Sequence, residues 1–142
     1  MIRNFKKSDL SRIMQIWLDT NIKAHSFIPK EYWTENFDLV KNLLPQAEVY
    51  VFEDDITNII GGFVGITENY IAGIFVSEKL QSKGIGKQLL DFVKTIKNQL
   101  TLNVYQKNER AVNFYCREDF TIQSINSDKD TGEKELLMLW KR

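Results

Sequence analysis

The chain has 142 residues, of which 43% are hydrophobic and 27% charged, a composition typical of a globular domain with a sizeable core. Its 19 basic and 19 acidic side chains balance, which gives no reason to expect non-specific binding to nucleic acid or to an anionic membrane. The single cysteine, Cys116, excludes an internal disulfide and a cysteine-rich metal site, and we expect no metal.

We expect no secretory signal and no membrane span from the pattern of polar and apolar residues. The N-terminus alternates polar and apolar residues, and no apolar run approaches the length of a membrane span. We therefore expect a cytoplasmic protein without a membrane segment. Cys116 is interpreted as a small, partly buried hydrophobic residue on a helix.

Hydrophobic periodicity, turn residues and helix-capping residues predict eleven elements without a linker or repeat between them. Ser8 is the candidate N-cap of the first helix, and Pro45 limits the second. In chain order we expect a strand at 2–5, helices at 8–23 and 30–44, strands at 49–52, 59–67 and 70–76, a helix at 85–96, a strand at 100–105, a helix at 108–115, and strands at 120–125 and 135–140. This order predicts one mixed α/β domain over residues 1–142, with helices covering one sheet.

The segment 81–87, Gln-Ser-Lys-Gly-Ile-Gly-Lys, lies between an expected strand and an expected helix. A loop at such a junction presents backbone N–H groups that can bind an anion. Gly84 and Gly86 have no Cβ, so a phosphate can approach the backbone closely. Ser82, Lys83 and Lys87 add hydrogen-bond donors and positive charge. The segment therefore predicts a phosphate-binding loop.

Two common phosphate motifs do not fit this loop. A Walker A motif that ends at Gly86-Lys87 requires glycine where the chain has Gln81 and Ser or Thr where it has Gln88. A dinucleotide-binding motif that starts at Gly84 requires glycine at the position of Leu89. The phosphate must therefore belong to another kind of ligand.

The pattern that fits is Gln-x-x-Gly-x-Gly, at Gln81, Gly84 and Gly86. It resembles the pyrophosphate-binding motif Gln/Arg-x-x-Gly-x-Gly/Ala of the GNAT family of N-acetyltransferases. A second block is similar to the family's second coenzyme-binding segment in residue types and spacing. It comprises Asn108, Ala111, Phe114, Tyr115 and Phe120. The expected element order also matches over the whole chain. The residues of segments 104–108 and 111–115, and the His-x-Phe sequence at His25, are most similar to those of small bacterial members.

The resemblance implies the GNAT fold, an α/β (α+β) architecture with a mixed central sheet of six to seven strands, four helices and splayed central strands. It implies acetyl-CoA as co-substrate and a primary amine as acceptor. The pantetheine arm would pair with the edge of strand 74–76, and an N–H near Phe75 or Val76 would face the thioester carbonyl. The cofactor-binding residues so implied are Ile74, Phe75, Val76, Gln81, Ser82, Lys83, Gly84, Ile85, Gly86, Lys87, Asn108, Ala111, Phe114 and Tyr115.

Tyr115 matches the family's catalytic tyrosine and is the candidate general acid. A tyrosine hydroxyl, with a reference pKa of about 10, can donate a proton to a leaving thiolate whose thiol has a pKa of roughly 8.5. Some relatives carry a glutamate as base on the strand before the second block, where this chain has Asn103. Three residues remain as candidates for the base: Glu68 acting through water, His25, and Tyr70.

We expect the acceptor pocket between the 25–29 loop, the 68–70 turn and the 128–132 hairpin. Its candidate residues are His25, Phe27, Tyr32, Glu68 and Tyr70. A protein lysine or a peptide N-terminal amine is the favoured acceptor. Small amines such as polyamines or aminoglycosides, and a non-catalytic acyl-CoA sensor, are the alternatives. Both a monomer and a homodimer are compatible with the sequence.

Overall fold

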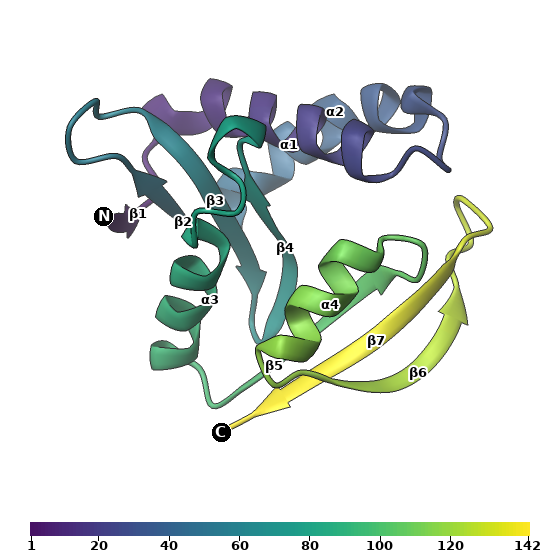
Figure 1. Cartoon of the computed structure of the whole chain (residues 1–142). Coiled ribbons are helices and arrows are strands. Elements are labelled where there is room, and N and C mark those ends of the chain that lie inside the picture. The colour runs from purple at the N-terminus through teal and green to yellow at the C-terminus, as the bar shows by residue number, and fades with distance from the viewer.

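The computed structural model describes residues 1–142 (Figure 1). Seven strands and four α-helices form in the order that the sequence predicts, with three short 3-10 turns between them. The elements are β1 (Ile2–Asn4), α1 (Leu10–Ala24), α2 (Lys30–Leu43), β2 (Glu48–Glu53), β3 (Ile60–Thr67), β4 (Tyr70–Val76), α3 (Ile85–Ile96), β5 (Gln99–Tyr105), α4 (Glu109–Arg117), β6 (Thr121–Ser127) and β7 (Lys134–Lys141). The predicted fold class, a mixed sheet with four helices, is confirmed.

All seven strands belong to one sheet in the order β1-β2-β3-β4-β5-β7-β6. Neighbouring strands are antiparallel except β4 and β5, which are parallel. These two pair only at Tyr70↔Thr101 and Ile71↔Leu102, at the start of β4. Beyond this point they diverge, as Figure 1 shows. The predicted splay is therefore present, and its open end lies beside Val76 and Tyr105.

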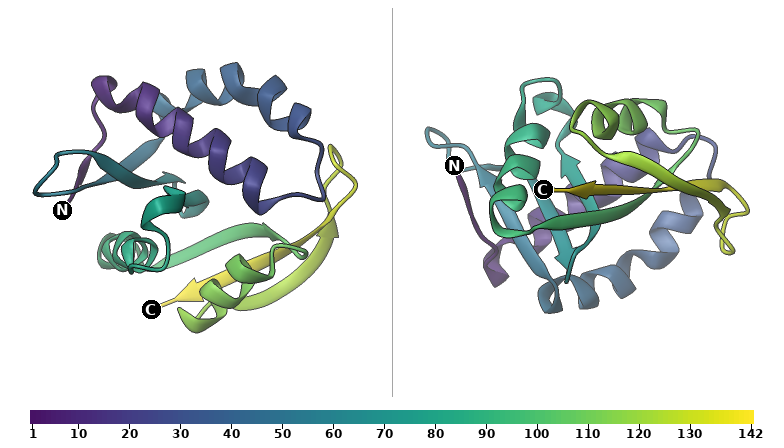
Figure 2. Two further views of the ribbon diagram at one scale, coloured as in Figure 1. Left: turned by 45° about the horizontal axis from the view of Figure 1, so that its top comes forward. Right: turned by 90° about the horizontal axis from the view of Figure 1, so that it is seen from below.

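Helices cover both faces of the sheet (Figure 2). On one face, α1 and α2 enclose a core around Ile13, Trp17 and Phe63. On the other face, α3 and α4 pack on a second core around Leu89 and Leu102. Because side chains alternate along a strand, β3 contributes to both cores, with Phe63 on the α1 side and Val64 on the α3 side. The sheet thus separates two independent hydrophobic clusters.

The first helix begins differently from the prediction. Residues Lys7–Asp9 form a 3-10 turn, and α1 starts at Leu10, so Ser8 is not its N-cap. The reason is the Asp9 carboxylate, which accepts hydrogen bonds from the Lys6 N–H at 2.8 Å and from Arg3 at 2.8 Å. Arg3 also binds Glu53 at 2.8 Å, which joins this turn to β1 and β2. The ion pair with Arg3 holds the pKa of Asp9 below its usual range.

Three further observations bear on the composition-based expectations. None of the helices is both long enough and apolar enough to cross a membrane. Cys116 is exposed on α4 rather than partly buried, because the short helix turns Tyr115 toward the core and leaves its neighbour outside. No group of three or more His, Cys, Asp or Glu side chains is arranged so that it could hold a metal ion.

The pairing of β3 with β4 is irregular next to the splay. Gly65 pairs with Gly73, and Ile66 pairs with Ile71, so Ala72 is an extra residue in β4. Such a bulge bends the strand and increases its twist. Gly62 faces the same strand, and a Cβ there would lie 2.8 Å from the Phe75 carbonyl oxygen. The backbone of β4 can therefore approach β3 at this level only beside a glycine.

We predict that Gly62→Ala destabilises the protein by about 1–3 kcal/mol, because the new methyl group displaces the β4 backbone at Phe75. Gly65→Ala is the matched control on the same strand, since its Cβ would lie 3.7 Å from Leu44, an ordinary contact. Urea unfolding of both variants measures the difference. Equal stability of the two variants would contradict the steric explanation.

Candidate active site

A cleft of about 1260 Å³ opens where β4 and β5 separate. Four segments far apart in the sequence line it: the end of α1, the end of β4, the glycine loop and the first turns of α4. Typical small-ligand pockets have volumes of roughly 300–1000 Å³. The cleft is therefore large enough for a nucleotide-sized ligand with a long arm.

The glycine loop and the N-terminus of α3 form one side of this cleft. Gly84 is the N-cap of α3 with φ +83°, and a Cβ there would touch nothing within 4 Å, so glycine is needed for the backbone conformation rather than for space. The first intrahelical bond runs from the Gln88 N–H to the Gly84 carbonyl at 3.0 Å. The N–H groups of residues 85–87 precede it and have no partner within the helix. This end of α3 is suited to bind an anion.

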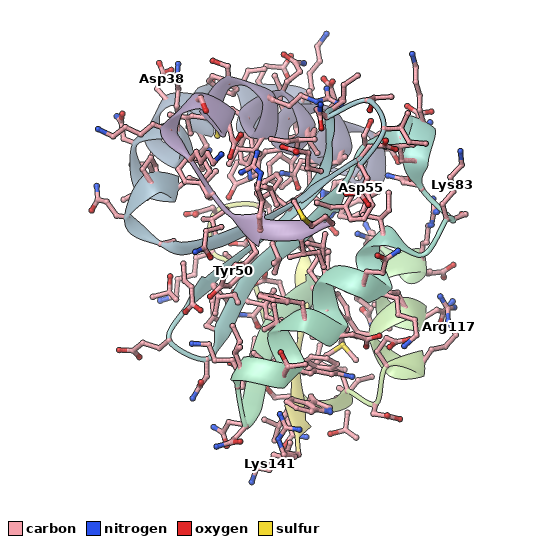
Figure 3. The ribbon with its side chains drawn as sticks, turned by 90° about the vertical axis from the view of Figure 1, so that its left-hand side faces the viewer. Asp38, Tyr50, Asp55, Lys83, Arg117 and Lys141 are labelled. Carbon is pink, nitrogen blue, oxygen red and sulfur yellow. The ribbon has the colours of Figure 1, made fainter.

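The lysines of the loop have different surroundings. Lys83 is exposed and projects outward from the loop (Figure 3). Lys87 lies 3.1 Å from the Glu118 carboxylate and 3.1 Å from that of Asp91. Glu118 and then Asp91 raise the pKa of Lys87, so it stays protonated. Its charge is shared with two carboxylates, which makes it a weaker anion ligand than the sequence implies.

Arg110, in the first turn of α4, is a site residue that sequence reasoning missed. Its guanidinium donates to the Gln81 side-chain oxygen and to Ser82 Oγ, both at 2.9 Å. Gln81 in turn donates its amide to the Val76 carbonyl at 2.9 Å. The Gln81 amide is thus engaged within the protein instead of awaiting a ligand. The only sequence signal was a basic residue between Asn108 and Ala111, which spacing alone could not connect to the loop.

The end of β4 has one unpaired edge toward the cleft. The Ser77 N–H donates to the Gly61 carbonyl in β3 at 2.8 Å. Because N–H groups alternate in direction along a strand, those of Ile74 and Val76 point away from β3, toward the cleft. Phe75 points its N–H toward β3 and stacks its ring on Phe63, with 4.9 Å between ring centroids. Of the two N–H groups expected to face a thioester, only that of Val76 is turned the right way.

Tyr115 lines the cleft from the α4 side, and its neighbours Ala111 and Phe114 line it too. Its ring packs against Phe114 and Phe120, with centroid distances of 5.2 and 5.5 Å. Burial raises the pKa of Tyr115, and Tyr70 adds to the shift. The hydroxyl therefore remains protonated at neutral pH and is able to donate a hydrogen bond.

His25 and Asn108 meet across the cleft. His25 follows α1 and is buried, with its ring stacked on Trp33 at 5.1 Å and edge-on to Tyr105 at 5.1 Å. Its Nε2 lies 3.2 Å from the Asn108 side-chain nitrogen. Asn108 caps α4, as predicted, by accepting from the Ala111 N–H at 3.3 Å. Burial lowers the pKa of His25, so the ring is neutral at physiological pH.

The α1 side of β5 carries aromatic and acidic groups. The Tyr105 hydroxyl donates to Asp128 at 2.6 Å, and Glu135 pairs with Tyr105 across the strands, so both side chains share a face. Burial raises the pKa of Glu135, and Asp128 adds to this. Burial also raises the pKa of Tyr32, with contributions from Asp128, Asp130 and Glu135. Three carboxylates thus surround Tyr32, on the face opposite α3 and α4.

The expected acceptor residues are only partly brought together. Phe27 packs on Tyr105 at 5.8 Å between ring centroids, near the open end of the splay. Tyr70 lies at the closed end, where its hydroxyl accepts from Asn103 at 3.2 Å. Glu68 is exposed in the β3–β4 turn, with φ +56°, so our placement of Glu68 at the mouth of the splay is wrong. The cause is the pairing of Tyr70 with Thr101, which closes the splay at this turn.

Comparison with known proteins identifies the family. A model described as an acetyltransferase (GNAT) domain matches residues 45–122. The chain is 36% identical to the peptidyl-lysine N-acetyltransferase YiaC of Escherichia coli, over 99% of this chain and 96% of YiaC. It is 27% identical to the peptidyl-lysine N-acetyltransferase YjaB of Escherichia coli, over 93% of this chain and 89% of YjaB.

Solved structures agree with this result. The solution structure of apo-form YjaB from Escherichia coli has a TM-score of 0.87 at 25% identity, and the alignment covers 99% of this chain and 96% of that one. The structure of yncA from Salmonella typhimurium with its cofactor acetyl-CoA has a TM-score of 0.68 at 14% identity, covering 99% and 92%, a likeness of fold. Because the family model matches more than half of the chain and YiaC aligns over almost all of it, the chain belongs to the GNAT family and is an acetyltransferase that uses acetyl-CoA.

Proposed function

We propose that this acetyltransferase transfers the acetyl group to the side-chain amine of a protein lysine, by direct attack through a tetrahedral intermediate. The observation that carries the proposal is the arrangement of the splay. A phosphate-binding loop and Tyr115 lie on one side of it, and aromatic and acidic groups lie on the other. The names of YiaC and YjaB, both peptidyl-lysine N-acetyltransferases, support the same acceptor class.

The donor would bind with its pyrophosphate at the N–H groups of residues 85–87 and its pantetheine arm along the unpaired edge of β4. An extended amide-containing arm can pair with a strand edge as an added strand does. The Val76 N–H then faces the thioester carbonyl and stabilises the negative charge that develops on its oxygen. Arg110 keeps the loop in place and adds a positive charge beside the phosphates.

In the chemical step, the neutral amine attacks the thioester carbon and a C–N bond forms. The tetrahedral intermediate then collapses, the C–S bond breaks, and the electron pair goes to sulfur. Tyr115 donates its hydroxyl proton to this thiolate, which leaves as the thiol of CoA. The nitrogen of the product releases its extra proton to solvent as the amide forms, and Tyr115 regains a proton from solvent. The raised pKa of Tyr115 favours the protonated state that this role requires.

The acceptor would approach from the α1 side of the sheet. A lysine carries an aliphatic stem and a cationic end, and this face offers rings from Tyr32 and Tyr105 beside the carboxylates of Asp128 and Glu135. Negative charge close to the site attracts the ammonium group before it loses its proton. Asn103, in place of the glutamate of some relatives, contributes no base. This face supports a cationic acceptor in general, and the names of the relatives favour lysine among such acceptors.

We predict that Tyr115→Phe lowers kcat by about 100-fold or more, because the thiolate then leaves without a proton donor. The KM for acetyl-CoA stays near the wild-type value, since the ring remains. Steady-state assays of CoA release provide both constants. Tyr50→Phe serves as the control, since Tyr50 binds Glu48 outside the cleft. A variant with the wild-type kcat would remove Tyr115 from the mechanism.

We predict that Arg110→Gln raises the KM for acetyl-CoA about tenfold with little change in kcat. The change removes two charge-assisted hydrogen bonds to the loop, and 1.4 kcal/mol corresponds to a factor of about ten. Lys141→Gln is the control for lost positive charge, because Lys141 lies at the far end of the molecule (Figure 3). If both variants show the same KM, the loop does not depend on Arg110.

We predict that Glu135→Gln raises the KM for the amine acceptor about threefold to tenfold and leaves the KM for acetyl-CoA unchanged. The substitution keeps the shape of the side chain and removes one of the three carboxylates around Tyr32. Glu133→Gln on the same hairpin is the control, since that carboxylate pairs with Lys107. A parallel change in both KM values would contradict a role specific to the acceptor.

A mass-spectrometric acetylation screen tests the acceptor class directly. Lysine-containing proteins, peptides with a free N-terminus, polyamines and aminoglycosides are offered side by side with acetyl-CoA. Acetyl groups mainly on lysine side chains support the proposal. Acetylation of peptide N-termini or small amines alone would overturn the acceptor class, and tight acetyl-CoA binding without turnover on any amine would indicate a sensor.

A further inference from the structure

We propose that His25 is a positioning residue for acetyl-CoA: its neutral imidazole, protonated at Nδ1, accepts a hydrogen bond from Asn108 and so holds the Asn108 amide in place for the pantetheine arm. The proposal rests on the role of Asn108 in donor binding. It replaces the earlier hypothesis that His25 is a general base.

The cap of α4 determines which way the Asn108 amide points. The Ala111 N–H, at 3.3 Å, requires an oxygen acceptor, so the Asn108 Oδ1 must face the helix. The amide nitrogen then faces His25, at 3.2 Å. An amide nitrogen carries only donor hydrogens, so the His25 Nε2 must offer a lone pair. A ring with a free Nε2 lone pair is neutral and carries its proton on Nδ1.

The surroundings of the ring agree with a neutral state. His25 is only 9% exposed, and its Nδ1 is buried without a hydrogen-bond partner. Trp33, Tyr105 and Phe27 enclose it with centroid distances of 5.1, 5.1 and 5.7 Å. Burial in this apolar enclosure disfavours the charged imidazolium, and its effect on the pKa outweighs the opposing effect of the Asn21 backbone. The ring is therefore built to accept, and it is poorly placed to take a proton from substrate.

Other titratable and charged groups face the ring or lie close to it on the surrounding elements. Tyr105 of β5 and Tyr32 of α2 both have pKa values raised above the usual tyrosine range. Asp128 lies beyond the Tyr105 hydroxyl as an ionised carboxylate, because its hydrogen bonds outweigh burial and lower its pKa. Lys107 sits 5.6 Å from the centre of the Phe27 ring. Lys23, two residues before His25, pairs with Glu78.

The position of the contact between His25 and Asn108 explains why it should influence the binding of acetyl-CoA. His25 follows α1, which packs with β3 and β4, whereas Asn108 precedes α4, which packs with β5. Both residues line the cleft that the pantetheine arm would enter. A protonated His25 would place an N–H against the Asn108 amide hydrogens. The amide would then move away or turn and lose its cap on α4.

The direction of the pH effect follows from the neutral state. Burial lowers the pKa of His25 below its ordinary 6.5, so the contact is complete above pH 6.5. It is lost as pH falls through the folded-state pKa. The affinity for acetyl-CoA should decline over the same range. The phosphate monoester of CoA also titrates, with a pKa of about 6. A matched variant is therefore needed to separate the protonation of His25 from that of the phosphate.

The test combines NMR with calorimetric binding. The chain has one histidine, so a long-range proton–nitrogen spectrum of the 15N-labelled protein contains a single imidazole. We expect the Nδ1–H tautomer and a titration midpoint below 6.5. The Nε2–H tautomer would overturn the proposal. In Asn108→Asp the carboxylate keeps the cap but accepts from the ring, so the midpoint should rise; an unchanged midpoint would show that the two side chains do not interact.

Binding of acetyl-CoA is compared in His25→Gln and His25→Leu from pH 8 to 5.5. Both variants lose the aromatic ring, but only glutamine retains an acceptor near the position of Nε2. We expect His25→Leu to bind about fivefold to tenfold more weakly than His25→Gln, with the protein still folded by circular dichroism. Wild type should lose more affinity than His25→Gln as pH falls. If His25→Gln and His25→Leu bind acetyl-CoA with the same affinity, the proposed role of His25 is wrong. If wild type binds acetyl-CoA in the same experiment, the acetyltransferase function is unaffected by that result.

Discussion

The short parallel pairing of β4 with β5 is the constraint on which the rest of the site depends. Two residue pairs hold the strands together at Tyr70 and Ile71, and beyond them β4 stays paired only with β3 and β5 only with β7. The N–H groups of Ile74 and Val76 consequently face a cleft and not a neighbouring strand. Unpaired backbone groups in a sheet need other partners. An extended, amide-containing donor would supply them in the binding mode proposed above, and the interruption of the sheet would then serve as the binding site.

An interrupted sheet also needs contacts that keep its halves at a defined distance. Arg110 connects α4 to the glycine loop on one side of the cleft. His25 contacts Asn108 on the other side. Both contacts start from the first residues of α4, so this short helix links the donor loop, the end of α1 and Tyr115. A ligand in the cleft would lie between the two contacts, and its binding depends on how well they keep their geometry.

The net charge of the chain is zero, but its charged side chains are unevenly distributed over the structure. Lysine and arginine side chains line the cleft, among them Lys79, Arg110 and Arg117, and Lys83 projects outward from the glycine loop beside it. Asp128, Asp130 and Glu135 gather on the opposite side of the sheet around Tyr32. An anionic donor and a cationic acceptor would thus each meet a surface of opposite charge. Such a separation favours approach of the two substrates from different sides.

Local patterns along the sequence determined the elements, the glycine loop and the family, because capping, periodicity and motif spacing involve residues that are near one another in the chain. Asn108 as a cap and Gly84 at the start of α3 are examples. The tertiary structure alone decided that Gln81 is bound by Arg110, that Glu68 lies at the closed end of the splay and that His25 contacts Asn108. These contacts join residues up to 83 positions apart. They depend on strand register and helix packing, which no local pattern specifies.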